Sequence, residues 1–229
     1  MSVTLKGISS MATRLVLADL VLPWQQRTGQ RVAIESVGGV DAAKRVAAGE
    51  AFDVVFLASD AIDKLLASGH LLPGSRVDLV RSGVAVAVRE GAPRPDISGE
   101  AAVRQAVLSA RSLSYSTGPS GVALARLFER WGIADQIKDR IVTPPPGIPV
   151  GSLVAKGDVE LGFQQLSELM PLQGITVLGA LPDAIQIVTT FSAGVCATTQ
   201  HADLVRELLA AMNAPETADT KRRHGMDAA

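Results

Sequence analysis

Residues 7–14, Gly-Ile-Ser-Ser-Met-Ala-Thr-Arg, join a β-like segment at residues 3–8 to a helical segment at residues 12–27. The same alternation continues along the chain, with strands expected at 32–37 and 53–58 and helices at 42–48 and 61–67. Strands joined by helical crossovers lie parallel in one sheet. The stretch from residue 3 to residue 67 therefore predicts an α/β fold with a mainly parallel sheet flanked by helices.

The alternation resumes after the turn-rich break Gly91-Ala92-Pro93. The expected strands are 83–88, 112–116, 159–163, 176–178 and 184–190, and the expected helices are 100–109, 123–131, 150–156 and 202–212, followed by a polar tail. Residues 143–147 contain three prolines and are expected to form a stiff connector. We therefore expect two lobes, a discontinuous one over residues 1–81 and 190–229 and a second over residues 82–189.

Composition limits the class of partner. The 229 residues are 47% hydrophobic but only 3% aromatic, as in tightly packed α/β layers. The 22 basic and 23 acidic residues give a net charge of −1, which provides no overall field for a nucleic-acid backbone. Any anion site must therefore be local, and no nucleic-acid partner is expected.

The one cysteine, Cys196, lies in the apolar run 191–197 and cannot form an intrachain disulfide. We expect it to be a buried structural thiol. No apolar span of 18 residues and no signal peptide are visible in the sequence as written, which predicts a cytoplasmic protein. If the sequence is a processed mature form, the expected location is the periplasm.

Two Gly/Ser-rich loops, residues 7–14 and 116–122, each lead into a predicted helix. Free backbone N–H groups, small hydroxyls and the positive end of a helix dipole form a receptor for a small anion or carboxylate. Ser9, Ser10 and Ser59 are candidate ligand residues, with a helix N-cap as the alternative for each, and the recurrence of the loop favours binding for Ser9 and Ser10. The same ambiguity applies to the hydroxyls in the second loop.

Other candidates have their own alternatives. Arg14 is either a bidentate partner for a carboxylate or a solvated surface residue. Gly118 and Gly121 are expected to be required by the backbone conformation of their loop. Asp41 and Glu168 lie near strand ends, as does Asp60, and are expected to have surface or capping roles.

The segment Phe52–Asp60, Phe-Asp-Val-Val-Phe-Leu-Ala-Ser-Asp, resembles a signature of type II periplasmic solute-binding proteins, especially the molybdate-binding branch. Matching segments follow the same order along nearly the whole chain: Gly7–Ser10, Gly38-Gly39, Gly118–Val122 and Lys156–Gly162. The resemblance implies a two-lobed fold with a ligand cleft between the lobes, closing by hinge motion, and an ABC permease as partner if the protein is exported. The ligand-binding residues expected from the loops and the resemblance together are Ser9, Ser10, Arg14, Gly38, Gly39, Ser59, Thr117, Gly118, Ser120, Gly121, Val122, Gln164 and Gln165.

One segment departs from the molybdate-binding pattern. Molybdate binders place a tyrosine after the late glycine, whereas this chain has Gly162-Phe163-Gln164-Gln165. A glutamine side chain both donates and accepts hydrogen bonds, which suits a carboxylate with hydroxyl or carbonyl groups better than a bare oxyanion. Because adjacent strand residues face opposite ways, at most one of Gln164 and Gln165 is expected to face the ligand.

We therefore expect a monomeric solute-binding protein for a small anion, an organic carboxylate rather than molybdate, with no metal or cofactor. The alternative is a cofactor-independent isomerase of a small tricarboxylate, since aconitate isomerases resemble molybdate-type binding proteins. No nucleophile elbow, phosphate-binding P-loop or metal-ligand cluster is visible, and the sequence names no catalytic base. A third possibility is a cytoplasmic ligand-sensing module with a protein partner.

Overall fold

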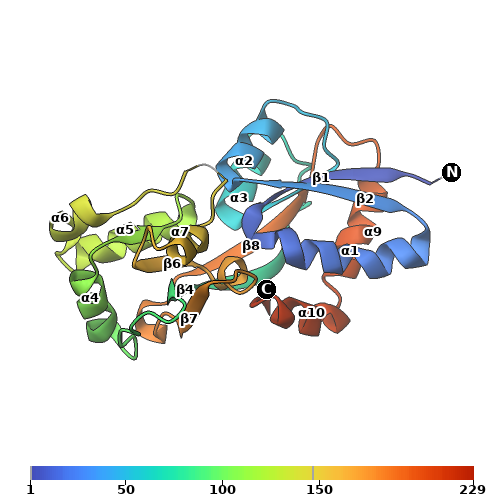
Figure 1. Cartoon of the computed structure of the whole chain (residues 1–229). Coiled ribbons are helices and arrows are strands. Elements are labelled where there is room, and N and C mark those ends of the chain that lie inside the picture. The colour runs from blue at the N-terminus through green and yellow to red at the C-terminus, as the bar shows by residue number, and fades with distance from the viewer. Residues whose placement is uncertain (1, 146) are drawn as a thin grey trace. The chain divides into compact units, whose positions relative to one another are not determined.

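A computed structural model describes residues 2–145 and 147–229 (Figure 1). The chain divides into two compact units. Unit 1 contains the described residues up to Arg81 together with Thr190–Ala229, and unit 2 contains Ser82–Thr189. Strands β4 (Val77–Arg89) and β8 (Val188–Val195) contribute residues to both units.

The sheet of unit 1 is built on three parallel strands in the order β2-β1-β3. These strands are β1 (Thr4–Ser10), β2 (Arg31–Val37) and β3 (Val54–Ala58). Strand β8 pairs with β3 in the antiparallel direction. The predicted alternation of strands and helices over residues 3–67 is confirmed.

Strand β3 is buried along its whole length because helices cover both faces of the sheet. Val54 and Phe56 belong to the core formed with α1 and α9, whereas Val55 and Leu57 belong to the core formed with α2 and α3. This alternation follows from the two-residue period of a strand. The helices are α1 (Arg14–Thr28), preceded by the 3-10 turn η1 (Met11–Thr13), α2 (Gly39–Ala47), α3 (Ser59–Ala67) and α9 (Ala202–Met212).

The end of α1 was signalled by the sequence. Gly29 follows the helix with φ of 69°, in the left-handed region that favours glycine, and its N–H donates to the carbonyl of Gln25. Cys196 is buried in the core beside α2 and α3, as predicted, and burial raises the pKa of its thiol to about 12.

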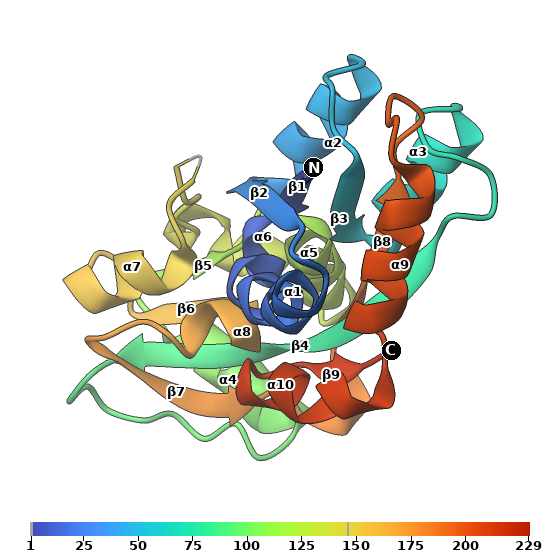
Figure 2. The ribbon, with the colours of Figure 1, turned by 90° about the vertical axis from the view of Figure 1, so that its right-hand side faces the viewer.

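In unit 2, β5 (Leu113–Tyr115) and β6 (Leu161–Gln165) form a parallel strand pair. Figure 2 shows β6 and β7 (Ile175–Ala180) on either side of β4, and both pair with β4 in the antiparallel direction. The core on one face is formed with α4 (Glu100–Ser109), α5 (Pro119–Arg130) and α6 (Ala134–Ile137), which is followed by η2 (Lys138–Arg140). Helices α7 (Val150–Lys156) and α8 (Leu166–Leu169) pack on the other face.

Several predicted boundaries are wrong, and the largest shift is in β4, which begins at Val77 rather than at residue 83. Helix α5 begins at Pro119 rather than residue 123, since proline suits the first turn of a helix. Strand β6 ends at Gln165 rather than residue 163, so both glutamines lie within the strand. The strand expected at 184–190 is replaced by η3 (Asp183–Ile185), a turn in which the N–H of Ile185 donates to the carbonyl of Pro182, and β8 begins only at Val188.

The expected polar tail is folded. It contains η4 (Pro215–Thr217), α10 (Ala218–Arg223) and β9 (Asp227–Ala228), which pairs with β4. Met226 is buried in the core of unit 1, and the buried Lys221 ammonium donates to the side-chain oxygen of Asn213. In the predicted connector, residues 143–145 have no regular secondary structure, and Pro146 lies outside the described residues.

Candidate functional site

The first group of predicted residues lies at one edge of the unit 1 sheet. Parallel strands end at the same edge, and here β1, β2 and β3 are followed directly by η1 with α1, by α2 and by α3. In open α/β sheets, ligands bind outside the carboxyl ends of the strands. We call Ser10, Gly38, Gly39 and Ser59, which stand at these helix starts, the unit 1 site.

Ser10 is the most informative residue of the unit 1 site. It is 8% exposed, and its Oγ has no hydrogen-bond partner among the described residues. A methyl group at Gly39 would lie 3.6 Å from the Cβ of Ser10, so the first turn of α2 lies beside this side chain. An unpaired buried hydroxyl costs free energy unless something satisfies it. Ser10 and the N-terminus of α2 together form a donor group suited to an anion.

The N-cap explanation does not account for the unit 1 serines. Ser10 occupies the N-cap position of η1, but its side chain makes no capping hydrogen bond. Ser59 is the first residue of α3, and the N-cap is Ala58. The N-cap interpretation of Ser59 is therefore wrong, and its half-buried hydroxyl is left for another role.

Ser9 and Arg14 differ in how far they are already paired. Ser9 is fully buried, and its Oγ lies 2.8 Å from the Oγ of Ser36, the residue opposite it in β2. Its hydroxyl therefore has a structural partner. Arg14 is exposed at the start of α1 and forms no ion pair with any residue that the structure describes, so its guanidinium is available.

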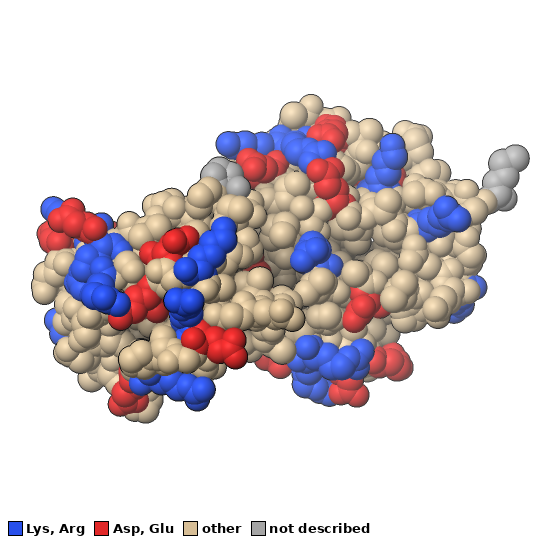
Figure 3. All heavy atoms as spheres, in the orientation of Figure 1, with Lys and Arg blue, Asp and Glu red and all other residues tan. Residues whose placement is uncertain are grey.

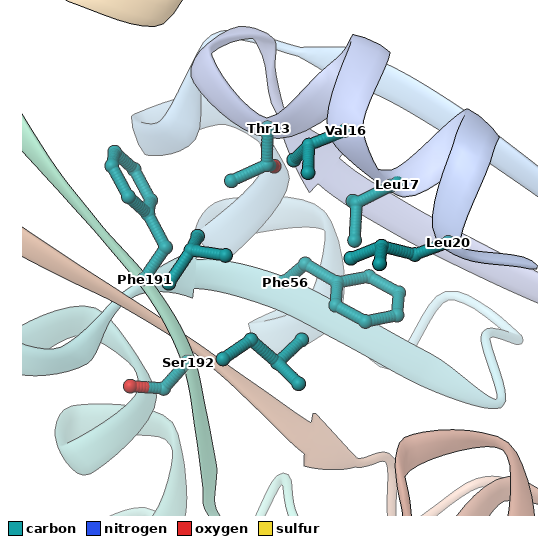
Figure 4. A pocket seen from close by; sticks show the side chains of 9 residues that line it. Thr13, Val16, Leu17, Leu20, Phe56, Phe191 and Ser192 are labelled. Atoms are coloured by element: carbon teal, nitrogen blue, oxygen red, sulfur yellow. The ribbon is translucent and has the colours of Figure 1, made fainter. Parts of the chain in front are cut away.

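Unit 1 also contains an apolar crevice, and this crevice is not an anion site (Figure 4). Its two hydroxyls are Thr13, which donates to the carbonyl of Ser10, and Ser192, which donates to Asp78. The remaining lining residues belong to the core: Val16, Leu17, Leu20, Phe56, Leu79, Val80 and Phe191. With both hydroxyls paired, the crevice offers no free polar group.

The second predicted loop forms the start of α5, and we call Thr117, Gly118, Ser120, Gly121 and Val122 the unit 2 site. Ser120 is buried, and its Oγ lies 3.0 Å from the Oγ of Ser116. A methyl group at Gly121 would lie 1.6 Å from the carbonyl oxygen of Ser116, so only glycine fits.

The two glycines of the unit 2 site have different roles. Gly118 has φ of −84°, which any residue adopts, and a methyl group there would meet nothing closer than 4.0 Å. The prediction that its backbone requires glycine is wrong. Gly121 is required by the close approach of α5 to Ser116 and not by an unusual φ.

A hollow of about 170 Å³ adjoins the unit 2 site. One part of its wall is hydroxylic, from Ser116, Thr117 and Thr143, and another part is apolar. The other lining residues are Tyr115, Gly121, Val122, Ala125 and Ile141. Ile141 and Thr143 were missed because nothing in their local sequence shows that they lie beside α5.

Gln164 and Gln165 are both buried and contact different elements. The side-chain oxygen of Gln164 accepts a 3.2 Å hydrogen bond from the backbone N–H of Gly151 in α7. The amide nitrogen of Gln165 donates to the hydroxyl of Thr189 at 2.8 Å, and its Oε1 has no partner within the described chain.

Glu168 follows these glutamines in α8 and is half-buried rather than on the surface, where it was expected. Burial raises the pKa of its carboxyl to about 7, and a hydrogen bond from Gln164 opposes that rise. A carboxyl that titrates near neutrality is suited to proton transfer. The sequence does not show this because the shift arises from tertiary burial.

The surface charges of the described residues do not form a field of one sign on the face that Figure 3 draws. On the face drawn in Figure 3, basic and acidic side chains are interspersed. Across residues 2–145 and 147–229, no three His, Cys, Asp or Glu side chains gather in a group that could hold a metal ion. No helix in the same residues is long and apolar enough to span a membrane.

Comparisons with known proteins place this geometry in a family. Residues 5–227 match the family model described as bacterial extracellular solute-binding protein. An aconitate isomerase from Pseudomonas sp is 38% identical over 231 residues, covering 97% of this chain and 87% of that protein.

Solved structures show the same fold. The periplasmic molybdate-binding protein of Azotobacter vinelandii superposes with a TM-score of 0.79 at 21% identity, covering 97% of this chain and 98% of that one. The binding protein AgtB from A. tumefaciens R10, in complex with agropinic acid, gives a TM-score of 0.77 at 14% identity, covering 100% and 83%. The predicted two-lobed α/β fold and the resemblance to molybdate-binding proteins are confirmed. The chain therefore belongs to the bacterial extracellular solute-binding protein family and has the fold of the periplasmic molybdate-binding proteins.

Proposed function

We propose that this protein binds a small organic anion with several carboxylates and that units 1 and 2 are its two ligand-binding lobes. The observation that carries the proposal is the buried Ser10 hydroxyl, unpaired among the described residues and placed beside the N-terminus of α2. Ser59 and Arg14, at the starts of the neighbouring helices, supply further donors for carboxylate oxygens.

The chemistry of unit 2 favours an organic ligand over a bare oxyanion. The unpaired acceptor Oε1 of Gln165 suits a ligand that carries a hydroxyl donor beside its carboxylates, as citrate does, and a bare oxyanion carries no such donor. The hollow beside Val122 also provides apolar contacts that suit a carbon skeleton. The complex of AgtB with agropinic acid supports the view that this fold accommodates an organic acid.

A thermal-shift panel tests the ligand class. The purified protein is heated with molybdate, tungstate, sulfate, citrate, cis-aconitate or trans-aconitate. A ligand at 100 times its dissociation constant stabilises the folded state by about 2.7 kcal/mol. We expect the midpoint to rise with the carboxylates, whereas a rise with molybdate and tungstate alone would contradict the proposal.

A second candidate function is isomerisation of aconitate on the same scaffold. The specific observation that favours it is the 38% identity to an aconitate isomerase over 97% of the chain. Proton NMR of the protein with cis-aconitate distinguishes the two functions. Appearance of the trans isomer identifies an enzyme, and unchanged ligand in the presence of binding identifies a receptor.

Partners and location follow from the same distinction. For a receptor, we propose an exported, monomeric protein that delivers its ligand to an ABC permease. An isomerase needs no permease. Fractionation of cells that produce the full-length gene product, followed by size-exclusion chromatography of the purified protein, tests location and oligomeric state.

A further inference from the structure

Isomerisation of aconitate needs a group that removes a proton from carbon, and neither the thiol nor the imidazoles of the described chain are placed for this. Cys196 is buried and its thiol has a pKa of about 12, raised by burial. His224 pairs with Asp19, and the other histidines, His70 and His201, follow α3 and precede α9 in unit 1. None of these groups lies at the unit 1 or unit 2 site.

Glu168 is placed differently. Strands β5 and β6 are parallel, so their carboxyl ends lie at the same edge of the unit 2 sheet. The chain leaves β5 through Ser116 into α5, and it leaves β6 directly into α8, which carries Glu168. The topology therefore brings Glu168 to the same sheet edge as the unit 2 site.

Gln164 holds the Glu168 carboxyl through a chain of hydrogen bonds. The N–H of Gly151 donates to Oε1 of Gln164, which fixes the orientation of the amide. The amide nitrogen then donates to the carboxylate of Glu168. Because one amide satisfies only part of a carboxylate, the remaining lone pairs of Glu168 are free to accept a proton.

We propose that Glu168 is the catalytic base that moves a proton between two carbons of bound aconitate, an assignment that rests on the isomerase function proposed above. The Glu168 carboxylate takes a proton from the methylene carbon, and the electron pair of that C–H bond forms a new carbon–carbon double bond. The original double bond shifts its electrons to the former vinyl carbon, which receives a proton from the Glu168 carboxylic acid, and exchange of that acid proton with solvent is what brings deuterium into the product in D₂O. No atom or electron is lost, and the new double bond forms as cis or trans.

The ionisation of Glu168 suits this role. With its pKa raised to about 7 by burial, the carboxyl exchanges a proton readily near neutral pH. Burial and the Gln164 hydrogen bond account for its pKa, and no charged neighbour in the described chain contributes. The Glu168 residue as a whole is partly exposed.

The test compares wild type with Glu168→Gln and with the control Glu90→Gln, which changes an exposed glutamate after β4. The turnover of cis-aconitate is followed by proton NMR, its dissociation constant by calorimetry, and deuterium uptake into recovered aconitate in D₂O. We expect Glu168→Gln to lower kcat by about 10²–10⁴-fold and to abolish deuterium uptake. Its dissociation constant should change by less than about threefold, as expected when a group acts mainly in the transition state. Glu90→Gln should behave as wild type.

A second variant keeps the assignment testable if Glu168→Gln does not fold. Glu168→Asp keeps the carboxyl but moves it by one methylene, which should lower kcat by about 10²-fold and leave deuterium uptake detectable. If wild type isomerises aconitate and either variant keeps wild-type kcat, this assignment is wrong while the isomerase function stands. If wild type binds aconitate but neither isomerises it nor exchanges its protons, the isomerase function fails and the assignment fails with it.

Discussion

The proposed unit 1 and unit 2 sites offer different chemical groups at equivalent places in the fold. Both lie where helices follow the carboxyl ends of parallel strands. Unit 1 offers donors, with the Ser10 hydroxyl beside the start of α2. Unit 2 adds apolar surface around Val122, an unpaired amide oxygen on Gln165 and the titratable Glu168.

This difference indicates a division of roles. Donors at helix starts recognise negative charge whatever carries it. Apolar surface discriminates between a carbon skeleton and a bare oxyanion, and a carboxyl that titrates near neutrality permits proton transfer. We therefore infer that unit 1 supplies charge recognition and that unit 2 supplies ligand identity.

The largest expected effect is steric and falls on unit 2. Gly121→Ala places a methyl group 1.6 Å from the carbonyl oxygen of Ser116, so α5 must shift. We expect the free energy of unfolding to fall by about 3 kcal/mol or more, measured by urea denaturation. Gly118→Ala is the matched control, because a methyl group there has space, and its effect should stay within about 0.5 kcal/mol. Equal effects of the two substitutions would contradict the packing of α5 described here.

The next effect concerns pH and stability. Burial raises the pKa of the Glu168 carboxyl in the folded state, so the folded protein binds this proton more tightly than the unfolded chain does. The free energy of unfolding therefore falls as pH rises from about 4.5 to 7. Glu168→Gln should therefore be more stable than wild type at pH 8, by at most about 3 kcal/mol, with the difference vanishing near pH 4. Thermal melts at several pH values measure this.

Asp78 in unit 1 provides a control of opposite sign. Hydrogen bonds from Arg76, opposed by burial and aided by Ser192, lower the pKa of its carboxyl. Its contribution to stability is present above pH 3.8 and is lost as pH falls through the lowered value. Asp78→Asn should thus destabilise the protein at pH 8. The same sign for both substitutions would contradict the assigned environments.

The third effect separates binding from stability at Ser10. Removing a buried hydroxyl that has no partner in the described protein leaves nothing newly unsatisfied, so Ser10→Ala should keep the wild-type melting midpoint or raise it slightly. A hydrogen bond to a charged ligand contributes about 1.5–3 kcal/mol, so affinity for the carboxylate should fall by about 10–100-fold in calorimetry. Ser9→Ala should show the reverse pattern, because it breaks the contact with Ser36. An unchanged affinity in Ser10→Ala would remove Ser10 from the site.

The smallest effect concerns the apolar wall of unit 2. Val122 is 50% exposed, so Val122→Ser should leave stability within about 0.5 kcal/mol of wild type. Loss of apolar contact should weaken aconitate binding by about 1 kcal/mol, or roughly fivefold. Calorimetry on Val122→Ser, Ser10→Ala and the double variant then shows whether their effects add. If each site engages its own part of one ligand, the losses of binding free energy in the two single variants should add in the double variant. Unchanged affinity in Val122→Ser would show that this wall is not part of the site.

Local signals determined how much of the fold the sequence predicts. Helices at 100–109, 150–156 and 202–212 were predicted to the residue because amphipathic patterns and end signals are local. Strand β8 was displaced and β9 was missed because their pairing with β3 and β4 depends on residues far away in the sequence.

The site shows the same limit. The sequence indicates Ser9 and Ser10 equally. Only the strand register shows that the Ser9 hydroxyl is hydrogen-bonded to that of Ser36, whereas the Ser10 hydroxyl has no partner in the described residues. Tertiary packing alone brings Ile141 into the lining of the unit 2 hollow. Tertiary packing also buries Glu168, which raises the pKa of its carboxyl. The sequence thus predicts which hydroxyls and glycines lie at helix starts. It does not predict which of those hydroxyls already have a hydrogen-bond partner.

The most direct test of ligand recognition is a calorimetric titration of the wild-type protein with trans-aconitate and, separately, with molybdate. Recognition of charge by unit 1 and of a carbon skeleton by unit 2 predicts saturable binding of trans-aconitate and binding of molybdate that is at least about tenfold weaker. Tight binding of molybdate without binding of trans-aconitate would contradict the proposed specificity.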